Sequence, residues 1–556
     1  MFTLKFIIRN LDQFFPRFIV VFIVGAVDSI LVFMIPVLLA EFTKGNFNQQ
    51  VFQRLFLYIL SLYAGSLILD WILRKYGESL AVQFGNHIKI KYFRALQKLP
   101  FKNILNTHSG YLLSLINKVS DGLEKNTYSL IWHFSQVFIV IALFVFFTAR
   151  ESIPIAFINL IILSVFVLIS TKLANKMVPI DKELNLKRAL FMGYYADFIA
   201  NLITIKKLSI GLFAEKKLKK RVAENYNQIY KLQKFHANRW LLLHLLFGIA
   251  FFSTIGFVLY SVAQGTVSPA ILILFVGAYQ MVRSNIERLS ENIRSLMETR
   301  AYLDNLESIV SLSREYDRET FDQPVSWNKI AFRHVVFLHK DGKRKIKIPD
   351  FCIKKGEKIC IVGKSGEGKT TFLNLLANLF APEGGRRLVD SNLYEKISPV
   401  FFSQQFGIVS QEIELFNISV KDNITIGKNV KERKIMHILE ELDLSGWVKG
   451  LPRGLDTMVG EKGVKLSAGQ KQRLNLARGY FLGREICLLD EPTSHLDVAT
   501  ESKVIKFLEK YFFSKTLVIV THRSKIKKIC NREYSMEKGV LKETKEEQQK
   551  QRTQLA

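Results

Sequence analysis

The sequence contains few cysteines, few prolines and few acidic residues. Its 556 residues include four Cys, 12 Pro and 49 Asp or Glu, against 78 Lys or Arg, so the formal net charge is +29. The cysteines all lie in the second half of the chain, at Cys352, Cys360, Cys487 and Cys530. Their spacing matches no metal site and predicts no disulfide framework. A charge of this sign alone is typical of nucleic-acid-binding proteins, but the positions of the basic residues favour another explanation.

Charged residues are scarce in six long apolar runs within about the first 285 residues. A helix needs about 20 apolar residues to cross a hydrocarbon core of about 30 Å, so we expect six membrane-spanning helices. They fall at residues 18–40, 55–73, 127–148, 152–171, 241–263 and 267–282, of which the last is short. Inside the first run, Asp28 either lines an internal cavity or forms an interhelical hydrogen bond.

The basic residues are concentrated in the two long loops between the runs, 76–126 and 172–239. The three short loops carry little charge by comparison. This asymmetry is the positive-inside pattern of membrane proteins. We therefore expect both long loops, both termini and the C-terminal part of the chain in the cytoplasm, and we expect no nucleic-acid partner. Apolar residues recur at helical spacing in the second loop, so the spans are expected to continue as cytoplasmic helices.

The chain changes character at residue 329. The stretches EKICIVG, EICLLDEP and TLVIVTH are short apolar strands that alternate with helical patterns, which predicts an α/β domain with its ligand at the carboxyl ends of parallel strands. We expect a helical transmembrane bundle at 1–310, a polar linker at 311–328, the α/β domain at 329–541 and a polar tail at 542–556.

The stretch IVGKSGEGKTTFLNLL fits the phosphate-loop pattern of a strand, a glycine loop and a helix. Glycines allow backbone N–H groups to surround a phosphate at a helix N-terminus. Lys369 is expected to reach the β- and γ-phosphate oxygens, and the Thr370 hydroxyl to ligate Mg²⁺. The expected ATP-binding residues are Gly363, Lys364, Ser365, Gly366, Glu367, Gly368, Lys369, Thr370 and Thr371.

The stretch ICLLDEPTSHLD supplies two acidic residues after a second buried strand. Asp490 is expected close to Mg²⁺, and Glu491 is placed to polarise an attacking water as general base. Together with the phosphate loop, this pair predicts hydrolysis of ATP.

These motifs resemble those of the ATP-binding-cassette (ABC) proteins, and the resemblance covers the whole α/β domain. The sequence LSAGQ is similar to that family's signature motif, and comprises Leu466, Ser467, Ala468, Gly469 and Gln470. Ala468 stands where the family has glycine; alanine restricts the backbone more than glycine does, but we expect the motif to work because Ser467 and Gly469 remain.

The resemblance assigns further residues of the site. It implies that Gln411 senses Mg²⁺ and water, that His522 contacts the γ-phosphate and that Asp497 ends the D-loop. His339 falls where the family has an aromatic residue stacked on adenine, and Glu461 falls in a loop typical of exporters. The implied metal-binding residues are Thr370, Gln411 and Asp490.

Six expected spans ahead of one such domain resemble an exporter half-transporter of the bacterial multidrug, lipid or peptide type. In that family the signature motif of one ATPase domain closes over ATP on the phosphate loop of another, so we expect a homodimer, with a heterodimer left open. We expect ATP and Mg²⁺ as cofactors, the lipid bilayer as surroundings and the bacterial cytoplasmic membrane as location.

The expected function is ATP-driven export, by alternating access, of an amphipathic or hydrophobic cargo such as a peptide, drug or lipid. The small number of charges in the spans favours such a cargo. Two alternatives are a flippase for lipids or lipid-linked glycans and an ATP-gated regulatory or channel-like membrane protein. The intact Glu491 and His522 argue against the latter.

Overall fold

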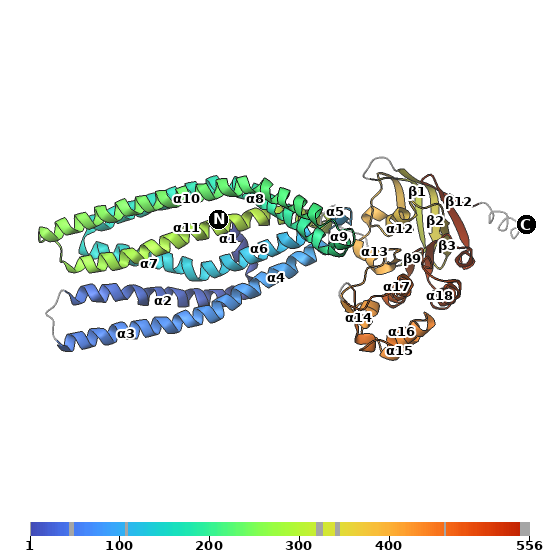
Figure 1. The fold of residues 1–556 in the computed structure, drawn as a ribbon, viewed down its shortest axis with the longest axis horizontal. Helices are drawn as coiled ribbons and strands as arrows, with labels where there is room; N and C mark the ends of the chain where they lie inside the picture. The colour runs from blue at the N-terminus through green and yellow to red at the C-terminus, as the bar shows by residue number, and fades with distance from the viewer. Residues whose placement is uncertain are drawn as a thin grey trace, which may run out of the picture. The chain divides into compact units, whose positions relative to one another are not determined.

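The computed structural model of the chain describes residues 2–43, 49–99, 101–105, 109–318, 326–339, 345–460 and 463–544. The chain divides into two compact units, Met1–Asp317 and Arg318–Ala556. The first unit consists of helices, and the second combines a large sheet with shorter helices (Figure 1). The fold class predicted from the sequence, a helical transmembrane bundle followed by an α/β domain, is therefore confirmed.

The helices of the first unit include several that are far longer than a membrane span. Helices α8, α10 and α11 have 48, 53 and 49 residues, and at about 1.5 Å per residue they are more than twice as long as a hydrocarbon core of about 30 Å is thick. The helices are α1 (Phe2–Asn10), α2 (Phe15–Phe42), α3 (Gln49–Ile72), α4 (Glu78–Gln97), α5 (Phe101–Leu105), α6 (Ser109–Ser129), α7 (Ser135–Glu151), α8 (Ile153–Ala200), α9 (Leu202–Lys207), α10 (Gly211–Ala263) and α11 (Ala270–Arg318).

The six apolar runs are helical apart from the first residues of the runs at 152–171 and 267–282, but the helical stretches differ in length. Within the described part of the chain, four helical segments are long and apolar enough to span a membrane: Asp12–Phe42, Gln49–Gln97, Ser109–Arg150 and Gly211–Ala263. The other two expected spans correspond to shorter apolar stretches, Ile153–Phe166 and Ala270–Asn285. These stretches open α8 and α11, which then continue as long helices with a more polar sequence.

The long helices of the first unit pack side by side: α8 against α10, α2 against α3 and α7, and α4 against α6 (Figure 1). Asp28 of α2 is 4% exposed and accepts a hydrogen bond of 2.5 Å from the Ser66 hydroxyl of α3. It also lines a cavity of about 380 Å³ together with Arg74 and His133. The two roles considered for Asp28 are therefore both present.

The second unit is built on a ten-stranded sheet with the order β5-β4-β1-β2-β12-β11-β3-β10-β9-β6, beside a small sheet of β7 and β8. Strands β11, β3, β10, β9 and β6 pair in parallel, whereas β4 and β2 flank β1 antiparallel. The strands are β1 (Lys329–Leu338), β2 (Lys345–Lys354), β3 (Lys358–Val362), β4 (Gly384–Val389), β5 (Asn392–Leu393), β6 (Phe406–Val409), β7 (Ile418–Ser419), β8 (Met458–Val459), β9 (Ile486–Asp490), β10 (Thr516–Val520), β11 (Arg532–Glu537) and β12 (Val540–Glu543).

The sheet of the second unit separates two hydrophobic cores. Alternate residues of β9 and β10 enter different cores: Leu488 and Val518 belong to one, Leu489 and Ile519 to the other. Strands covered on both faces need continuous apolar sequences, which explains ICLLD and TLVIV. The helices are α12 (Lys369–Leu376), α13 (Pro399–Gln405), α14 (Val420–Thr425), α15 (Glu432–Glu441), α16 (Ser445–Lys449), α17 (Ala468–Leu482), α18 (Val498–Tyr511) and α19 (Ser524–Lys527).

Two boundaries expected from the sequence lie elsewhere in the structure. Helix α11 continues to Arg318, so the first residues assigned to the linker 311–328 are helical. Strand β12 ends at Glu543, so the first residues assigned to the tail 542–556 belong to the sheet. The expected linker and tail also include residues 319–325 and 545–556, which lie outside the described residues.

Arg387 on β4 generates a prediction about the stability of the second unit. This residue is 2% exposed, and its guanidinium donates to the carbonyl oxygens of Leu375 and Phe380 at 3.1 and 3.0 Å. Substitution Arg387→Leu removes both donors, and leaving buried acceptors unpaired costs roughly 1–3 kcal/mol. We expect a lower midpoint when the chain is unfolded in denaturant. The exposed neighbour Arg386, changed to Leu, is the control; an equal loss in both variants contradicts the prediction.

Candidate active site

The candidate site lies where four parallel strands end at the same edge of the sheet. Strands β3, β10, β9 and β6 are successive neighbours, so the segments that follow them meet there. A cavity of about 450 Å³ occupies this edge. Its lining includes most of the residues expected to bind nucleotide: His339, Ser365, Gly366, Glu367, Gly368, Lys369, Thr370, Thr371, Gln411, Asp490 and Glu491.

The loop between β3 and α12 needs glycine at two positions. Gly363 and Gly368 have φ values of 155° and 107°, in a backbone region that residues other than glycine rarely adopt. A Cβ atom on Gly363 would lie 2.4 Å from the Met536 carbonyl oxygen, and one on Gly368 would lie 2.5 Å from Ile346 Cδ1. The loop therefore curls tightly against its neighbours and presents its backbone N–H groups at the start of α12, an arrangement that favours an anion.

Lys369 begins α12 and is 7% exposed. Its Nζ donates to the carbonyl oxygens of Gly363 and Lys364 at 2.6 and 2.9 Å, and it lies 3.1 Å from Nε2 of His522. Burial lowers the pKa of the Lys369 ammonium, while the nearby carboxylates of Glu491 and Asp490 act in the opposite direction. The cation is thus held within the loop that is expected to surround the phosphates.

Thr370 and Asp490 supply oxygen atoms that suit Mg²⁺. The Thr370 hydroxyl donates to Oδ2 of Asp490 at 2.7 Å. Burial raises the pKa of Asp490, and the hydrogen bond from Thr370 opposes this effect. Mg²⁺ is commonly held by one or two protein oxygens together with phosphate oxygens and water. The Thr370 hydroxyl and the Asp490 carboxylate fit this kind of site.

Glu491 occupies a strained backbone conformation directly after β9. Its φ is 47°, an uncommon value for a residue other than glycine. Two hydrogen bonds hold the residue there: its N–H donates to the Val520 carbonyl at 2.9 Å, and its carbonyl accepts from Gln472 Nε2 at 2.6 Å. The Glu491 side chain lines the cavity, and residues in uncommon backbone conformations are often found at functional sites.

The other two residues expected to act in catalysis meet the carboxylate of Glu491. Gln411, two residues after β6, donates to Oε2 of Glu491 at 3.2 Å. Nε2 of His522, two residues after β10, lies 3.4 Å from Oε1. Gln411 and His522 therefore flank the two oxygens of the same carboxylate, and His522 also contacts Lys369.

The cavity has two further walls that the sequence analysis missed. Lys345 and Ile346 contribute from the start of β2, and Lys538 and Gly539 contribute from the turn between β11 and β12. Lys538 and Gly539 have φ values of 48° and 75°, typical of a two-residue hairpin turn. The signal in the sequence was the pair Lys-Gly between two short strands, but nothing in that pair indicates which site the turn faces.

The signature segment lies away from the cavity of its own chain, since none of residues 466–470 lines it. Ser467 caps α17: its hydroxyl accepts from the Gln470 N–H at 3.1 Å, and the Gln470 side chain accepts from the Ser467 N–H at 2.9 Å. Ser467 and Ala468 are exposed. Ala468 sits in the first turn of the helix, a conformation that alanine adopts without strain.

The last residues expected from the sequence are Asp497 and Glu461, of which Glu461 belongs to the exporter-type loop. The Asp497 carboxylate caps α18 by accepting from the N–H groups of Ala499 and Thr500 at 3.0 and 2.9 Å. Hydrogen bonds from Thr500 lower the pKa of Asp497, which keeps the cap charged. Glu461 lies outside the described residues.

Comparison with known protein families gives two matches in one chain. Residues 18–284 match the family described as ABC transporter transmembrane region, and residues 346–494 match the family described as ABC transporter. The first match covers most of the helical unit, and the second covers the phosphate loop, the signature segment and Glu491.

The chain is also similar to individual proteins. It is 25% identical over 543 residues to a protein of Syntrophus aciditrophicus named ATP-dependent lipid A-core flippase, a match that covers 95% of this chain and 89% of that protein. It is 29% identical over 338 residues to a protein of the same name from Methylobacillus flagellatus, covering 60% of this chain and 57% of that relative. A solved structure of a bacterial Atm1-family ABC exporter with ATP bound has a TM-score of 0.84 at 19% identity and covers 98% of this chain and 97% of that one; this likeness shows the fold.

The contacts of Lys369 predict a specific loss on its removal. Lys369→Ala should weaken ATP binding about tenfold to a hundredfold, because hydrogen bonds to charged groups contribute about 1.5–3 kcal/mol. Equilibrium binding of a fluorescent ATP analogue to the purified chain measures the effect. Lys506→Ala is the matched control, since the Lys506 side chain is exposed on α18 and lies outside the cavity lining. Unchanged affinity in Lys369→Ala contradicts the assigned role.

Proposed function

The chain belongs to the ABC transporters, and from this premise we propose that it is a half-transporter that exports an amphipathic or hydrophobic cargo by alternating access, driven by ATP. The observation that carries the proposal is that Lys369 and Glu491 line one cavity and that His522 contacts both of them. The same chain carries a helical unit long enough and apolar enough to cross a membrane. We place it in a bacterial cytoplasmic membrane, with both termini and the α/β unit in the cytoplasm, from the distribution of basic residues.

The proposed reaction is hydrolysis of the bond between the β- and γ-phosphates of ATP, in which water attacks the γ-phosphorus and ADP leaves. The backbone of the glycine loop and Lys369 bind the phosphates, and His339 lies at the cavity where adenine is expected. Glu491 takes a proton from the attacking water, while Gln411 and His522 hold its carboxylate in position from either side. Thr370, Asp490 and Gln411 would hold Mg²⁺, which neutralises charge on the phosphates when bound.

A second copy of the chain is proposed as the partner. The exposed start of α17, with Ser467 and Ala468, lies outside the cavity of its own chain, yet a helix N-terminus of this kind suits a phosphate. In a dimer with a two-fold axis, the signature segment of each copy lies at the cavity of the other copy. Such an interface uses the same surface on both copies, so no further copies are added. A heterodimer with a related chain satisfies the same geometry.

Among cargoes, a lipid has the support of the similar proteins named lipid A-core flippases. An ATP-gated channel is the alternative of another class. It is disfavoured because Glu491 and its two neighbours are arranged for hydrolysis rather than for nucleotide binding alone. ATPase activity that rises with cargo supports the exporter, whereas ATP-dependent conductance without cargo-stimulated hydrolysis supports the channel.

The first test of the proposed reaction is Glu491→Gln in the chain reconstituted in lipid nanodiscs. Loss of a general base lowers a rate by about a hundredfold to ten-thousandfold, so we expect steady-state ATP hydrolysis to fall by at least a hundredfold. ATP binding should persist, because the phosphate loop is intact. Glu509→Gln, at an exposed position on α18, should keep the activity of the unmodified chain. Robust hydrolysis by Glu491→Gln would refute the catalytic assignment.

Composite sites predict an asymmetry between two mixed dimers. When one copy carries Lys369→Ala and the other carries Ser467→Ala, both defects fall in one composite site and the second site is intact. When one copy carries both substitutions, each site has one defect. We expect the first arrangement to keep about half of the ATPase activity if the sites act independently, and the second to lose most of it. Both dimers contain the same substitutions, so stability is matched; equal activities contradict the composite site.

A further inference from the structure

Two lysines from outside the phosphate loop line the cavity of the candidate active site. Lys345 opens β2, and Lys538 lies in the turn between β11 and β12. Neither belongs to a motif that predicted the site, and the proposed reaction uses neither of them. Lys369, the cation that it does use, comes from the start of α12. The cavity therefore has a second source of positive charge, on different elements of the fold.

The two lysines are attached to one continuous piece of backbone beside the phosphate loop. The Gly539 carbonyl accepts a hydrogen bond of 2.7 Å from β2, and a Cβ atom on Gly539 would lie 2.4 Å from the Lys345 carbonyl oxygen. The turn that carries Lys538 thus lies directly against the start of β2. The next residue of β2 packs on the phosphate loop, since Ile346 Cδ1 would lie 2.5 Å from a Cβ atom on Gly368. The backbone of both lysines is therefore held close to the phosphate loop.

The balance of charge in the cavity depends on these two lysines. Three carboxylates line the cavity, those of Glu367, Asp490 and Glu491. Against Lys369 alone they would leave an excess of two negative charges, three minus one, in a cavity that is to receive a polyanion. Bound Mg²⁺ offsets part of this excess, but only at the end of the cavity where Asp490 lies. Lys345 and Lys538 bring the described lining to three cations and three carboxylates.

The order of the strands indicates which part of a nucleotide the two lysines face. The sheet runs β2-β12-β11-β3-β10-β9-β6. Glu491 follows β9 and the phosphate loop follows β3, so in the proposed reaction the γ-phosphate lies toward β9. The rest of the nucleotide then extends the other way, past the phosphate loop and toward β12 and β2. The anionic group on that side is the α-phosphate, and Lys345 and Lys538 line that end of the cavity.

We propose that Lys345 and Lys538 bind the α-phosphate of the nucleotide, so that they set the affinity of the cavity for ADP as much as for ATP. The inference rests on the proposed function, since it takes ATP as the ligand of this cavity. A lysine ammonium is a compact charge on a flexible stem and binds phosphate without a fixed geometry. ADP keeps its α-phosphate after hydrolysis, so the two lysines slow release of the product as well as of the substrate. Glu491 remains the residue that acts in the chemical step.

The test is equilibrium binding of radiolabelled ADP and AMP to the full-length chain in lipid nanodiscs. The variant Lys345→Gln/Lys538→Asn removes both charges, and asparagine tolerates the left-handed backbone at position 538. We expect the affinity for both nucleotides to fall about tenfold or more, by the same factor, because charge-assisted hydrogen bonds to their shared phosphate are lost. Adenosine, which has no phosphate, should compete equally well in the variant and in the unmodified chain.

Three outcomes of the binding experiment overturn the inference. Unchanged affinity for ADP in the variant means that the lysines do not contact the nucleotide. A loss for ADP without a loss for AMP means that they face the β-phosphate. An equal loss for adenosine means that the variant has altered the cavity by some route other than a phosphate contact.

The matched control is Lys354→Gln/Lys542→Gln. Lys354 and Lys542 are exposed on β2 and β12, outside the cavity lining, so the control loses the same charge from the same two strands and should bind ADP as the unmodified chain does. Equal losses in the two double variants would assign the effect to net charge and overturn the inference. Lys538→Arg keeps the charge on the same backbone and should retain most of the affinity. A loss as large as that in Lys538→Asn would show that charge is not the cause.

Steady-state ATP hydrolysis separates binding from chemistry in the same variants. In Lys345→Gln/Lys538→Asn the KM for ATP should rise about tenfold, whereas kcat should not fall, because the contacts of Glu491 are untouched. A fall in kcat at unchanged KM would place the lysines in the chemical step and contradict the inference.

The inference and the proposed function can fail separately. If ATPase activity is lost in Glu491→Gln while Lys345→Gln/Lys538→Asn binds ADP and AMP as its control does, the α-phosphate site fails and the proposed function stands. If the unmodified chain binds ADP through the two lysines but hydrolyses no ATP, ATP-driven export fails and the α-phosphate site stands.

Discussion

The parallel pairing of β3, β10, β9 and β6 is the constraint on which the candidate active site depends. Parallel neighbours end at the same edge of a sheet, so this order alone brings Lys369, His522, Glu491 and Gln411 together from four separate parts of the chain. Strands β10, β9 and β6 contribute buried residues to both cores, which makes their register hard to shift. The positions of these side chains are therefore set by backbone pairing before any contact between the side chains themselves forms.

Within that frame, two features store free energy at the site. Glu491 keeps a left-handed backbone that a glutamate seldom adopts, held by Val520 on one side and Gln472 on the other. Lys369 is nearly buried, and burial lowers the pKa of its ammonium. Its hydrogen bonds to two loop carbonyls offset part of that cost. Both residues are fixed in place by the surrounding structure, so binding of a phosphate group requires little reorganisation of the site.

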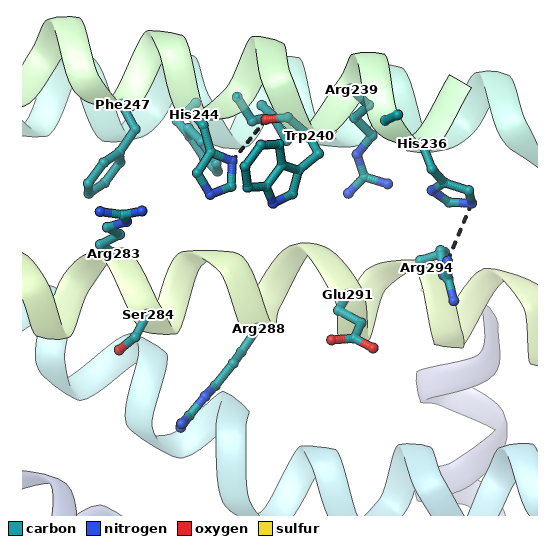
Figure 2. Close-up of a pocket in the computed structure, with 13 residues that line it drawn as sticks. His236, Arg239, Trp240, His244, Phe247, Arg283, Ser284, Arg288, Glu291 and Arg294 are labelled. Atoms are coloured by element: carbon teal, nitrogen blue, oxygen red, sulfur yellow. Dashed lines mark hydrogen bonds between the residues drawn. The ribbon is translucent and has the colours of Figure 1, made fainter. Parts of the chain in front are cut away.

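The sequence predicted the α/β unit, and most of the residues that converge on its cavity, because the relevant information is local. A glycine loop between a strand and a helix, or two acidic residues after a buried strand, has a meaning that depends on adjacent residues only. The turn at Lys538 and Gly539 was missed because its place at the cavity depends on the pairing of β12 beside β2. The cavity lined by Arg239 and Arg294 in the helical unit (Figure 2) was missed for the same reason. These residues belong to two different helices, and the sequence does not indicate how the two helices are aligned against each other.

Counting the charges near the ends of the apolar runs predicts how the chain is oriented in the membrane, but it does not predict which arginines are buried. A positive charge beside an apolar run orients the chain in the membrane, and any exposed lysine or arginine serves that purpose equally well. Burial is not needed for orientation, and taking a guanidinium out of water costs free energy unless polar groups compensate it. Arg239 is 6% exposed and faces a cavity rather than bulk solvent. Membrane topology explains the sign of its charge, and its burial follows from the packing of α10 against α8, where its guanidinium lies 3.9 Å from the Met177 sulfur.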